Sequence, residues 1–222
     1  MHIGLVAGIG PAATDFYYRG LIDRHVAGGR PLDLTMAHAD VREMSRNLVG
    51  RNPKRQAEIF AGLVGRLKAA GAQAAAITSM GGHFCVNELM AISPLPILNA
   101  VPAVEATLAR GKFRKIGILG TRTVMETRLY GGIPSVEVIP TEGVALDLVH
   151  DNYVAMATIG HVTEVQRHVF FDAGRELCAR GAEAIMLGGT DLFLAFAGHD
   201  PGFPVIDCAD IHVDAIYAKS AA

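Results

Sequence analysis

The stretch "AAGAQAAAITS" (residues 69–79) has a near copy further along the chain, "ARGAEAIMLGG" (179–189). A second pair, "HIGLVAG" (2–8) and "KIGILGT" (115–121), repeats in the same order. Both members of each pair have the pattern of a short apolar strand. Because the two offsets are nearly equal, the repeats predict two similar halves. The alternative is that any two buried strands of a parallel sheet look alike.

Amphipathic segments separate the apolar runs along most of the chain. Strands are predicted at 2–8, 32–39, 72–78, 115–121, 136–141 and 182–189, and helices at 14–27, 54–71 and 163–180, with another helix starting at 122. Short apolar strands that alternate with helices are typical of βαβ units, with a parallel sheet buried on both faces. The fold class is therefore α/β, and ligands are expected beyond the carboxyl ends of the strands.

The predicted boundary between the halves lies near "PLPILNAVPA" (94–103). Residues 1–99 would form the first half, completed by 207–222, and residues 100–206 the second. In this interpretation the closing strand and helix in "PVIDCADIHVDAIYAKSA" (204–221) return to the first half. A cleft between the halves is the expected ligand site. The ends of the two third strands would then flank a substrate carbon, as a racemase requires for removing and returning a proton.

Composition excludes several classes of function. The chain has 222 residues, 50% of them hydrophobic, and a net charge of −2. This charge gives no case for nucleic acid or an anionic membrane as a partner. The first residues, "MHIGLVAGIG", predict a strand and not a signal peptide, and no apolar run is long enough to span a bilayer. The three cysteines, Cys85, Cys178 and Cys208, lack C-x-x-C spacing, which favours a reducing cytoplasm without a disulfide framework or zinc site.

Four segments in order resemble the aspartate/glutamate racemase superfamily, whose enzymes work without pyridoxal phosphate. "GLVAGIGPAATDFYYRGL" (4–21) is similar to the family's opening glycine-rich loop and tyrosine-bearing helix, and "GILGTRTVMETRLY" (117–130) to its second-half loop. "GAEAIMLGGTDLFL" (181–194) and "PVIDCADIHVDA" (204–215) resemble its third strand of the second half and its closing motif. The resemblance covers nearly the whole chain and implies the family's two-half fold.

The departures from the family pattern fall at the catalytic positions. The first half usually carries Cys-Asn-Thr-x-His, and counting back from His83 places Ser79 at the cysteine, Met80 at the asparagine and Gly81 at the threonine. The second half's Cys-Thr-Glu appears as Gly189-Thr190-Asp191. A serine hydroxyl is a far weaker acid than a thiol and needs an adjacent base, and glycine carries no proton. The family's usual thiol pair is therefore absent.

The resemblance implies a set of site residues. The predicted catalytic group is Ser79, His83 and Asp191, with His83 either activating Ser79 or exchanging a proton itself. The predicted substrate-binding residues are Gly8, Gly10, Pro11, Thr78, Met80, Gly81, Thr121, Arg122, Thr123, Gly189 and Thr190. The glycine loop could hold a carboxylate at a helix start, or simply be the turn between strand and helix. Thr121 and Thr123 could bind ligand or cap a helix, and His83 could cap the helix that follows it.

Several roles stay open in the sequence. The family uses an arginine from the region 37–55 for the substrate carboxylate, and Arg42, Arg46 and Arg51 are the candidates. Asp207 and His212 match the closing motif, where structural hydrogen bonding is favoured. Cys85 should point into the helix after the loop, and Cys178 into a core.

Three functions fit these residues. The first is a cofactor-independent amino-acid racemase or isomerase acting on a small amino or dicarboxylic acid. The second is a divergent lyase, hydrolase or decarboxylase-like enzyme that uses Ser79 and His83, since the superfamily includes decarboxylases, maleate-type isomerases and hydantoin racemases. The third is a catalytically inactive carboxylate-binding protein. No metal or cofactor is expected, and the resemblance implies a homodimer.

Overall fold

The computed structural model describes all 222 residues, which form two compact units: residues 1–99 with 212–222, and residues 100–211. The first unit has a three-stranded parallel sheet in the order β2-β1-β3, from β1 (Ile3–Ala7), β2 (Leu34–His38) and β3 (Ala74–Ile77). An isolated parallel bridge between Ala75 and Ile97 extends the sheet beyond β3.

The second unit repeats this arrangement. Its parallel sheet has the order β5-β4-β6-β7, from β4 (Lys115–Leu119), β5 (Glu137–Pro140), β6 (Ile185–Leu187) and β7 (Val205–Asp207). β4 corresponds to β1, β5 to β2 and β6 to β3, while β7 takes the place of the bridge at Ile97. The predicted fold class, two α/β subdomains with parallel sheets, is confirmed.

The closing strand corrects one expectation. β7 pairs with β6, with Val205 opposite Ile185 and Asp207 opposite Leu187, so it belongs to the second sheet and does not return to the first half. The helix that follows, α10 (Cys208–Ser220), contributes only its residues from 212 onward to the first unit. A strand this short carries no sequence signal for its partner, because its register depends on which sheet edge is available.

Three of the strands are buried from end to end. Every residue of β1 and β3 is buried, as is every residue of β6. Small residues allow the helices to approach closely: a Cβ on Gly4 would lie 2.9 Å from Leu67 of α3 in the first unit, and one on Gly117 would lie 2.9 Å from Leu177 of the covering helix in the second. Continuous apolar runs of this kind are what a parallel sheet covered on both faces requires.

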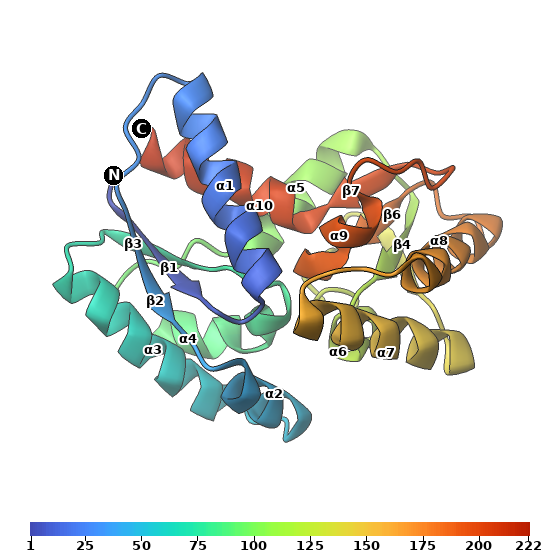
Figure 1. The fold of residues 1–222 in the computed structure, drawn as a ribbon, viewed down its shortest axis with the longest axis horizontal. Helices are drawn as coiled ribbons and strands as arrows, with labels where there is room; N and C mark the ends of the chain where they lie inside the picture. The colour runs from blue at the N-terminus through green and yellow to red at the C-terminus, as the bar shows by residue number, and fades with distance from the viewer. The chain divides into compact units, whose positions relative to one another are not determined.

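Helices cover both faces of the first sheet (Figure 1). α1 (Pro11–Ala27) and the end of α10 lie on one side, and α3 (Pro53–Ala69) and α4 (Val86–Ile92) on the other. A 3₁₀ turn, η1 (Gly81–Cys85), leads into α4. The polar segment after β2 forms α2 (Val41–Val49), which the sequence did not predict because Met44 is its only buried residue.

The second unit contains α5 (Ala100–Gly111), α6 (Arg122–Glu126), α7 (Gly143–Ile159), α8 (Glu164–Ala179), η2 (Thr190–Leu192) and α9 (Phe193–Phe196). α8 begins with a capping box, in which the Thr163 hydroxyl accepts from the backbone of Gln166 while the Gln166 side chain accepts from the backbone of Thr163. The predicted helix from residue 122 is a single short turn. α7 was not predicted, and it is the element that completes the candidate site of this unit.

Candidate functional site

The sequence-predicted site residues gather at the carboxyl ends of the central strands. In the first unit they follow β1, at Gly8, and β3, at Thr78. In the second unit they follow β4, at Thr121, and β6, at Gly189. Carboxyl ends of parallel strands are where α/β sheets place ligands. Each unit therefore offers one candidate half-site, and the predicted cleft between the halves stays a prediction.

Thr14 holds the glycine loop after β1 in place through a hydrogen bond. The backbone N–H of Gly8 donates to the Thr14 hydroxyl at 2.9 Å, and the Thr78 hydroxyl donates to the Val6 carbonyl at 3.2 Å. The Thr14 and Thr78 hydroxyl oxygens lie 3.5 Å apart. Thr14 was not among the predicted site residues, although its place in the first turn of a helix after a glycine loop is a usable signal.

The start of α1 retains the features of an anion site. Gly10 is its N-cap without a side-chain hydrogen bond, and Pro11 occupies the first turn. A 17-residue helix presents the positive end of its dipole there. Gly8 has a φ of +86°, and a Cβ on it would lie 2.9 Å from the Ala39 carbonyl oxygen. The loop therefore needs glycine at this position.

Replacing Gly8 by Ala should lower the free energy of unfolding by about 2 kcal/mol, because the new Cβ is strained in the left-handed region and crowds the Ala39 carbonyl. Chemical denaturation measures the change. Gly62→Ala is the matched control, since a Cβ on Gly62 meets nothing within 4 Å and Ala favours the interior of α3. Equal stability of Gly8→Ala and the parent chain would contradict the strain.

Ser79 and His83 are neighbours, but not as hydroxyl and base. The Ser79 hydroxyl oxygen accepts from the backbone N–H of Gly82 at 3.2 Å, and the side chain is half-buried. His83 Nδ1 lies 2.7 Å from the Ser79 carbonyl oxygen. A carbonyl can only accept, so Nδ1 carries the proton and donates it. The geometry fits the alternative in which His83 holds the loop, and catalysis by His83 stays a prediction.

His83 belongs to a buried network with His212 and Tyr17. The His83 and His212 rings meet edge to face with centroids 5.5 Å apart. His212 Nε2 donates to the Leu98 carbonyl at 2.8 Å, so its Nδ1 accepts from the Tyr17 hydroxyl, also at 2.8 Å. Burial lowers the pKa of His83 to about 4, and burial together with His83 lowers the pKa of His212 to about 3. Both rings are therefore neutral at pH 7.

The other predicted site residues of the first unit are either fully buried or exposed on the surface. Thr78, Met80 and Gly81 are buried. The three candidate arginines, Arg42, Arg46 and Arg51, are all exposed. Arg42 and Arg46 stand on α2, where Arg42 pairs with the N-capping Asp40 at 3.8 Å. The structure does not single out one arginine as a carboxylate ligand.

The cysteines are free thiols. Cys85 is buried with Sγ 3.5 Å from the Gly82 carbonyl oxygen, and burial raises the pKa of this thiol to about 12. Burial also raises the pKa of Cys178 and, most strongly, that of Cys208. A thiol with a raised pKa is a poor proton carrier at neutral pH. No group of three or more His, Cys, Asp or Glu side chains is arranged to hold a metal ion.

In the second unit, the residues after β4 are engaged within the unit. The Thr121 hydroxyl caps α6 by accepting from Val124, and the Thr123 carbonyl accepts from Thr127 at 2.6 Å. The backbone N–H of Arg122 donates to His150 Nδ1 at 3.1 Å, while its guanidinium pairs with Asp147 and Glu126. Arg122 is therefore neutralised by two carboxylates in this structure.

The end of β6 is filled by a tyrosine from α7. The Tyr153 hydroxyl donates to Asp191 Oδ2 at 3.1 Å, and both side chains are buried. A Cβ on residue 189 would lie 2.3 Å from Tyr153 Cε2 and 3.0 Å from its hydroxyl oxygen. Thr190 is buried beside this pair. The ring of Tyr153 thus occupies the space that a side chain at position 189 would need.

Three polar residues of α7 reach this half-site, and none was predicted. Asp147, His150 and Tyr153 recur every three positions and so share one face of the helix. The signal that would have placed them is the apolar spacing of Leu146, Val149, Tyr153 and Met156, all buried in the core. Recognising α7 from this spacing would have placed all three polar residues on a single helix face.

In the closing motif (204–215), the hydrogen bonds of Asp207 and His212 stabilise the fold. Asp207 caps α10 by accepting from the backbone N–H of Ala209 at 2.8 Å and of Asp210 at 3.3 Å. Burial raises the pKa of Asp207 to about 6, against the lowering effect of these two donors. His212 lies in the network of the first unit described above.

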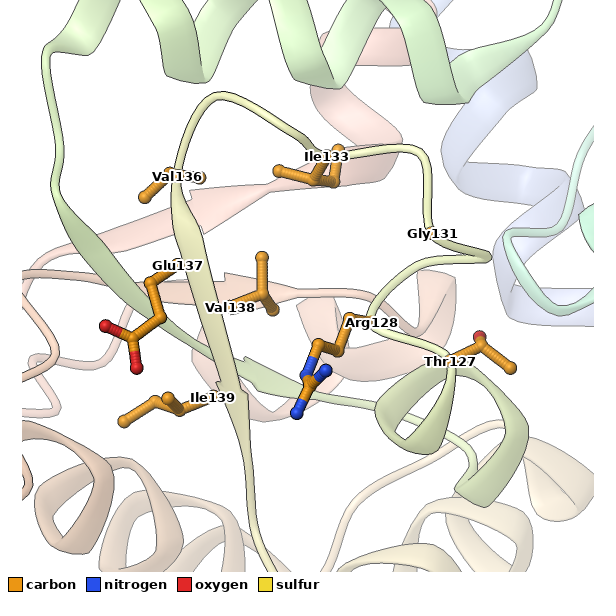
Figure 2. Close-up of a pocket in the computed structure, with 8 residues that line it drawn as sticks. All are labelled: Thr127, Arg128, Gly131, Ile133, Val136, Glu137, Val138 and Ile139. Atoms are coloured by element: carbon orange, nitrogen blue, oxygen red, sulfur yellow. The ribbon is translucent and has the colours of Figure 1, made fainter.

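A separate pocket of about 390 Å³ lies against the edge strand of the second sheet (Figure 2). It is lined by Thr127, Arg128, Gly131, Ile133, Val136, Glu137, Val138 and Ile139. Figure 2 shows Arg128 reaching toward β5, with Glu137 and Val138 on opposite sides of the strand. None of the predicted site residues lines this pocket, so it is distinct from the half-sites at the strand ends.

Two α/β units with glycine-rich loops and polar residues at the carboxyl ends of their first and third strands define the racemase class of fold. Residues 6–216 match the Asp/Glu/Hydantoin racemase family. The chain belongs to this family.

Solved structures agree with this assignment. A proposed Asp/Glu racemase of Yersinia pestis is 24% identical with a TM-score of 0.85, and each chain is covered in full. An aspartate racemase homologue from Pyrococcus horikoshii is 20% identical with a TM-score of 0.78, covering 100% of this chain and 99% of the other. Aspartate racemase of Picrophilus torridus is 14% identical with a TM-score of 0.81, covering 99% and 94%. At these identities the likeness shows the fold. No helix of the chain combines the length and apolarity that crossing a membrane would need.

Proposed function

We propose that the chain is a cofactor-independent racemase or isomerase of a small amino or dicarboxylic acid, working with non-standard catalytic residues. The observation that carries the proposal is the family match over residues 6–216, with the predicted site residues at the carboxyl ends of the corresponding strands of both units. Two structural relatives, one named an aspartate racemase and one named an aspartate racemase homologue, support an acidic amino acid as the first substrate to try.

The binding features suit a carboxylate. The start of α1 at Gly10 offers the positive end of a helix dipole to the substrate carboxylate. Ser79 follows β3, with its hydroxyl oriented by the Gly82 N–H. Removal of an α-proton leaves negative charge on the substrate, and donors of this kind stabilise it. Ser79 and Asp191 are the proposed proton-handling residues of the first and second unit.

A second candidate is a carboxylate-binding protein without turnover. It is favoured by the hydrogen bond from His83 to the Ser79 carbonyl, which leaves Ser79 without a visible base, and by the loss of any proton carrier at Gly189. Such a protein would keep the helix start that binds the carboxylate. It would be stabilised by ligand and would not exchange the α-proton.

The test is α-proton exchange in D₂O, followed by NMR, with both enantiomers of aspartate, glutamate and a broad amino-acid panel. Exchange supports the racemase proposal. Thermal stabilisation by an acid that shows neither exchange nor loss of optical rotation would instead support the binding protein.

Ser79→Ala should lower the exchange rate of one enantiomer by about 100-fold while leaving the fold intact, because it removes a positioned hydroxyl that handles the proton on one face of the substrate. Ser79→Cys is the informative partner, since it restores the family's thiol on a side chain of similar shape, and it should retain or raise the rate. Ser93→Ala, on a residue outside the strand-end loops, controls for loss of a hydroxyl. Full activity of Ser79→Ala would remove Ser79 from the mechanism.

A further inference from the structure

A racemase needs a proton carrier on each side of the substrate's α-carbon, and glycine at position 189 supplies none. The second unit nevertheless places a hydroxyl there. Tyr153 reaches from α7 to the end of β6, and its oxygen would lie only 3.0 Å from a Cβ on residue 189. The space that a side chain at this position would use is therefore occupied by a phenol.

The Tyr153 hydroxyl has a defined proton acceptor. It donates to Asp191 Oδ2 at 3.1 Å. Asp191 follows β6 within η2, so the carboxylate stands on the strand end itself. The pair is held by packing as well, since Tyr153 belongs to the buried core of the unit with Leu146 and Val149.

We propose that Tyr153 and Asp191 together form the proton carrier of the second unit, in place of the missing thiol. This inference rests on the proposed racemase function. Tyr153 is the catalytic residue that meets the α-carbon, and Asp191 is the base behind it. Neither the family pattern at Gly189-Thr190-Asp191 nor the local sequence assigns a role to Tyr153.

The step balances as a relay. The α-proton passes to the Tyr153 oxygen while the phenol proton passes to Asp191 Oδ2, and the electron pair of the broken C–H bond stays on the substrate carbon. Asp191 ends as a carboxylic acid and Tyr153 as a neutral phenol. In the reverse direction Asp191 returns its proton to the phenol oxygen, and the phenol proton forms the new C–H bond.

The electrostatics favour a relay over a free phenolate. Burial, followed by the negative charge of Asp191, raises the pKa of Tyr153 well above its ordinary value. A phenolate would therefore be costly at neutral pH, while concerted transfer through the phenol never creates one. Glycine at position 189 is what leaves room for the ring, because any larger residue would displace it.

The experiment measures α-deuterium exchange of L- and D-aspartate and of L- and D-glutamate, separately for each enantiomer, with the full chain and its variants. Tyr153→Phe keeps the ring and removes the hydroxyl. It should reduce exchange from one enantiomer roughly 100-fold and leave exchange from the other within a few-fold, because each carrier removes the proton from only one face. Asp191→Asn should affect the same enantiomer. Tyr18→Phe, on an exposed ring, is the control that should leave both rates unchanged.

The outcomes separate the two proposals. Exchange by the parent chain that Tyr153→Phe leaves equal for both enantiomers would overturn the relay and leave the racemase function in place. An equal loss for both enantiomers together with a lowered Tm would mark Tyr153 as structural and would also overturn the relay. If the parent chain exchanges neither enantiomer of any acid tested, the racemase function fails and the relay fails with it.

Discussion

At pH 5 the free energy of unfolding should be about 3 kcal/mol lower than at pH 7, mainly because His83 and His212 are buried as neutral rings. Their pKa values are lowered to about 4 and about 3, whereas an unfolded histidine titrates near 6.5. At pH 5 these two histidines therefore bind protons in the unfolded chain and remain unprotonated in the folded chain. The stability that the two rings contribute is complete above pH 6.5 and is lost as the pH falls toward 4.

The size of this loss follows from the pKa shifts of the two histidines, reduced by one group that acts in the opposite direction. The pKa of an unfolded histidine lies about 1.5 units above pH 5. At pH 5 this difference lowers the free energy of unfolding by about 2 kcal/mol for each of the two buried rings. Asp207 acts in the opposite direction, because its pKa is raised to about 6 and the folded chain gains a proton as the pH falls. This gain offsets about 1 kcal/mol between pH 7 and pH 5.

Two variants separate these contributions in urea denaturation at pH 7, 6 and 5. His83→Gln keeps a donor for the Ser79 carbonyl and should flatten the pH dependence by about 2 kcal/mol. Asp207→Asn removes the opposing group and should steepen the loss by about 1 kcal/mol. His168→Gln, on an exposed ring of α8, is the matched control for the loss of an imidazole. A parent chain equally stable at pH 5 and pH 7 would show that the two rings accept protons when folded.

A thiol introduced at position 189 should destabilise this chain. Gly189→Cys should lower the free energy of unfolding by about 3 kcal/mol, because its Cβ would lie 2.3 Å from the buried ring of Tyr153. The backbone does not cause this cost, since Gly189 has an extended conformation that any residue can adopt. Ser79→Cys is the matched control in the first unit, where a Cβ is already present, and should cost less than about 1 kcal/mol.

A double-mutant cycle identifies the clash. Tyr153→Ala alone should destabilise by about 4 kcal/mol through the cavity it leaves. The double variant Tyr153→Ala/Gly189→Cys should be destabilised by at least about 1 kcal/mol less than the sum of the two single losses, because the thiol then occupies the space that the ring has vacated. Additive losses would show that Tyr153 does not exclude a side chain from position 189. The same cycle in α-proton exchange tests whether the restored thiol replaces the phenol.

The sequence predicted the strands better than the helices. β1 and β3 were found because a strand buried on both faces must be apolar throughout, and that run is visible in one dimension. α2 was missed because it buries little and depends on its cap Asp40. α7 was missed although its apolar spacing was present, because polar residues such as Asp147 and His150 interrupt the run. β7 was assigned to the wrong half because three residues do not specify a partner.

By itself, the sequence indicated the two-half α/β class and the family resemblance, and it predicted Ser79 and Gly189 as the positions that correspond to the family's two thiols. These follow from local composition and from motifs that are continuous along the chain. Only the tertiary structure decided that His83 Nδ1 donates a hydrogen bond to the Ser79 carbonyl, and that Tyr153 fills the space at Gly189 beside Asp191. Tyr153 and Asp191 lie 38 residues apart on different elements, and only the packing of α7 against the end of β6 brings them together.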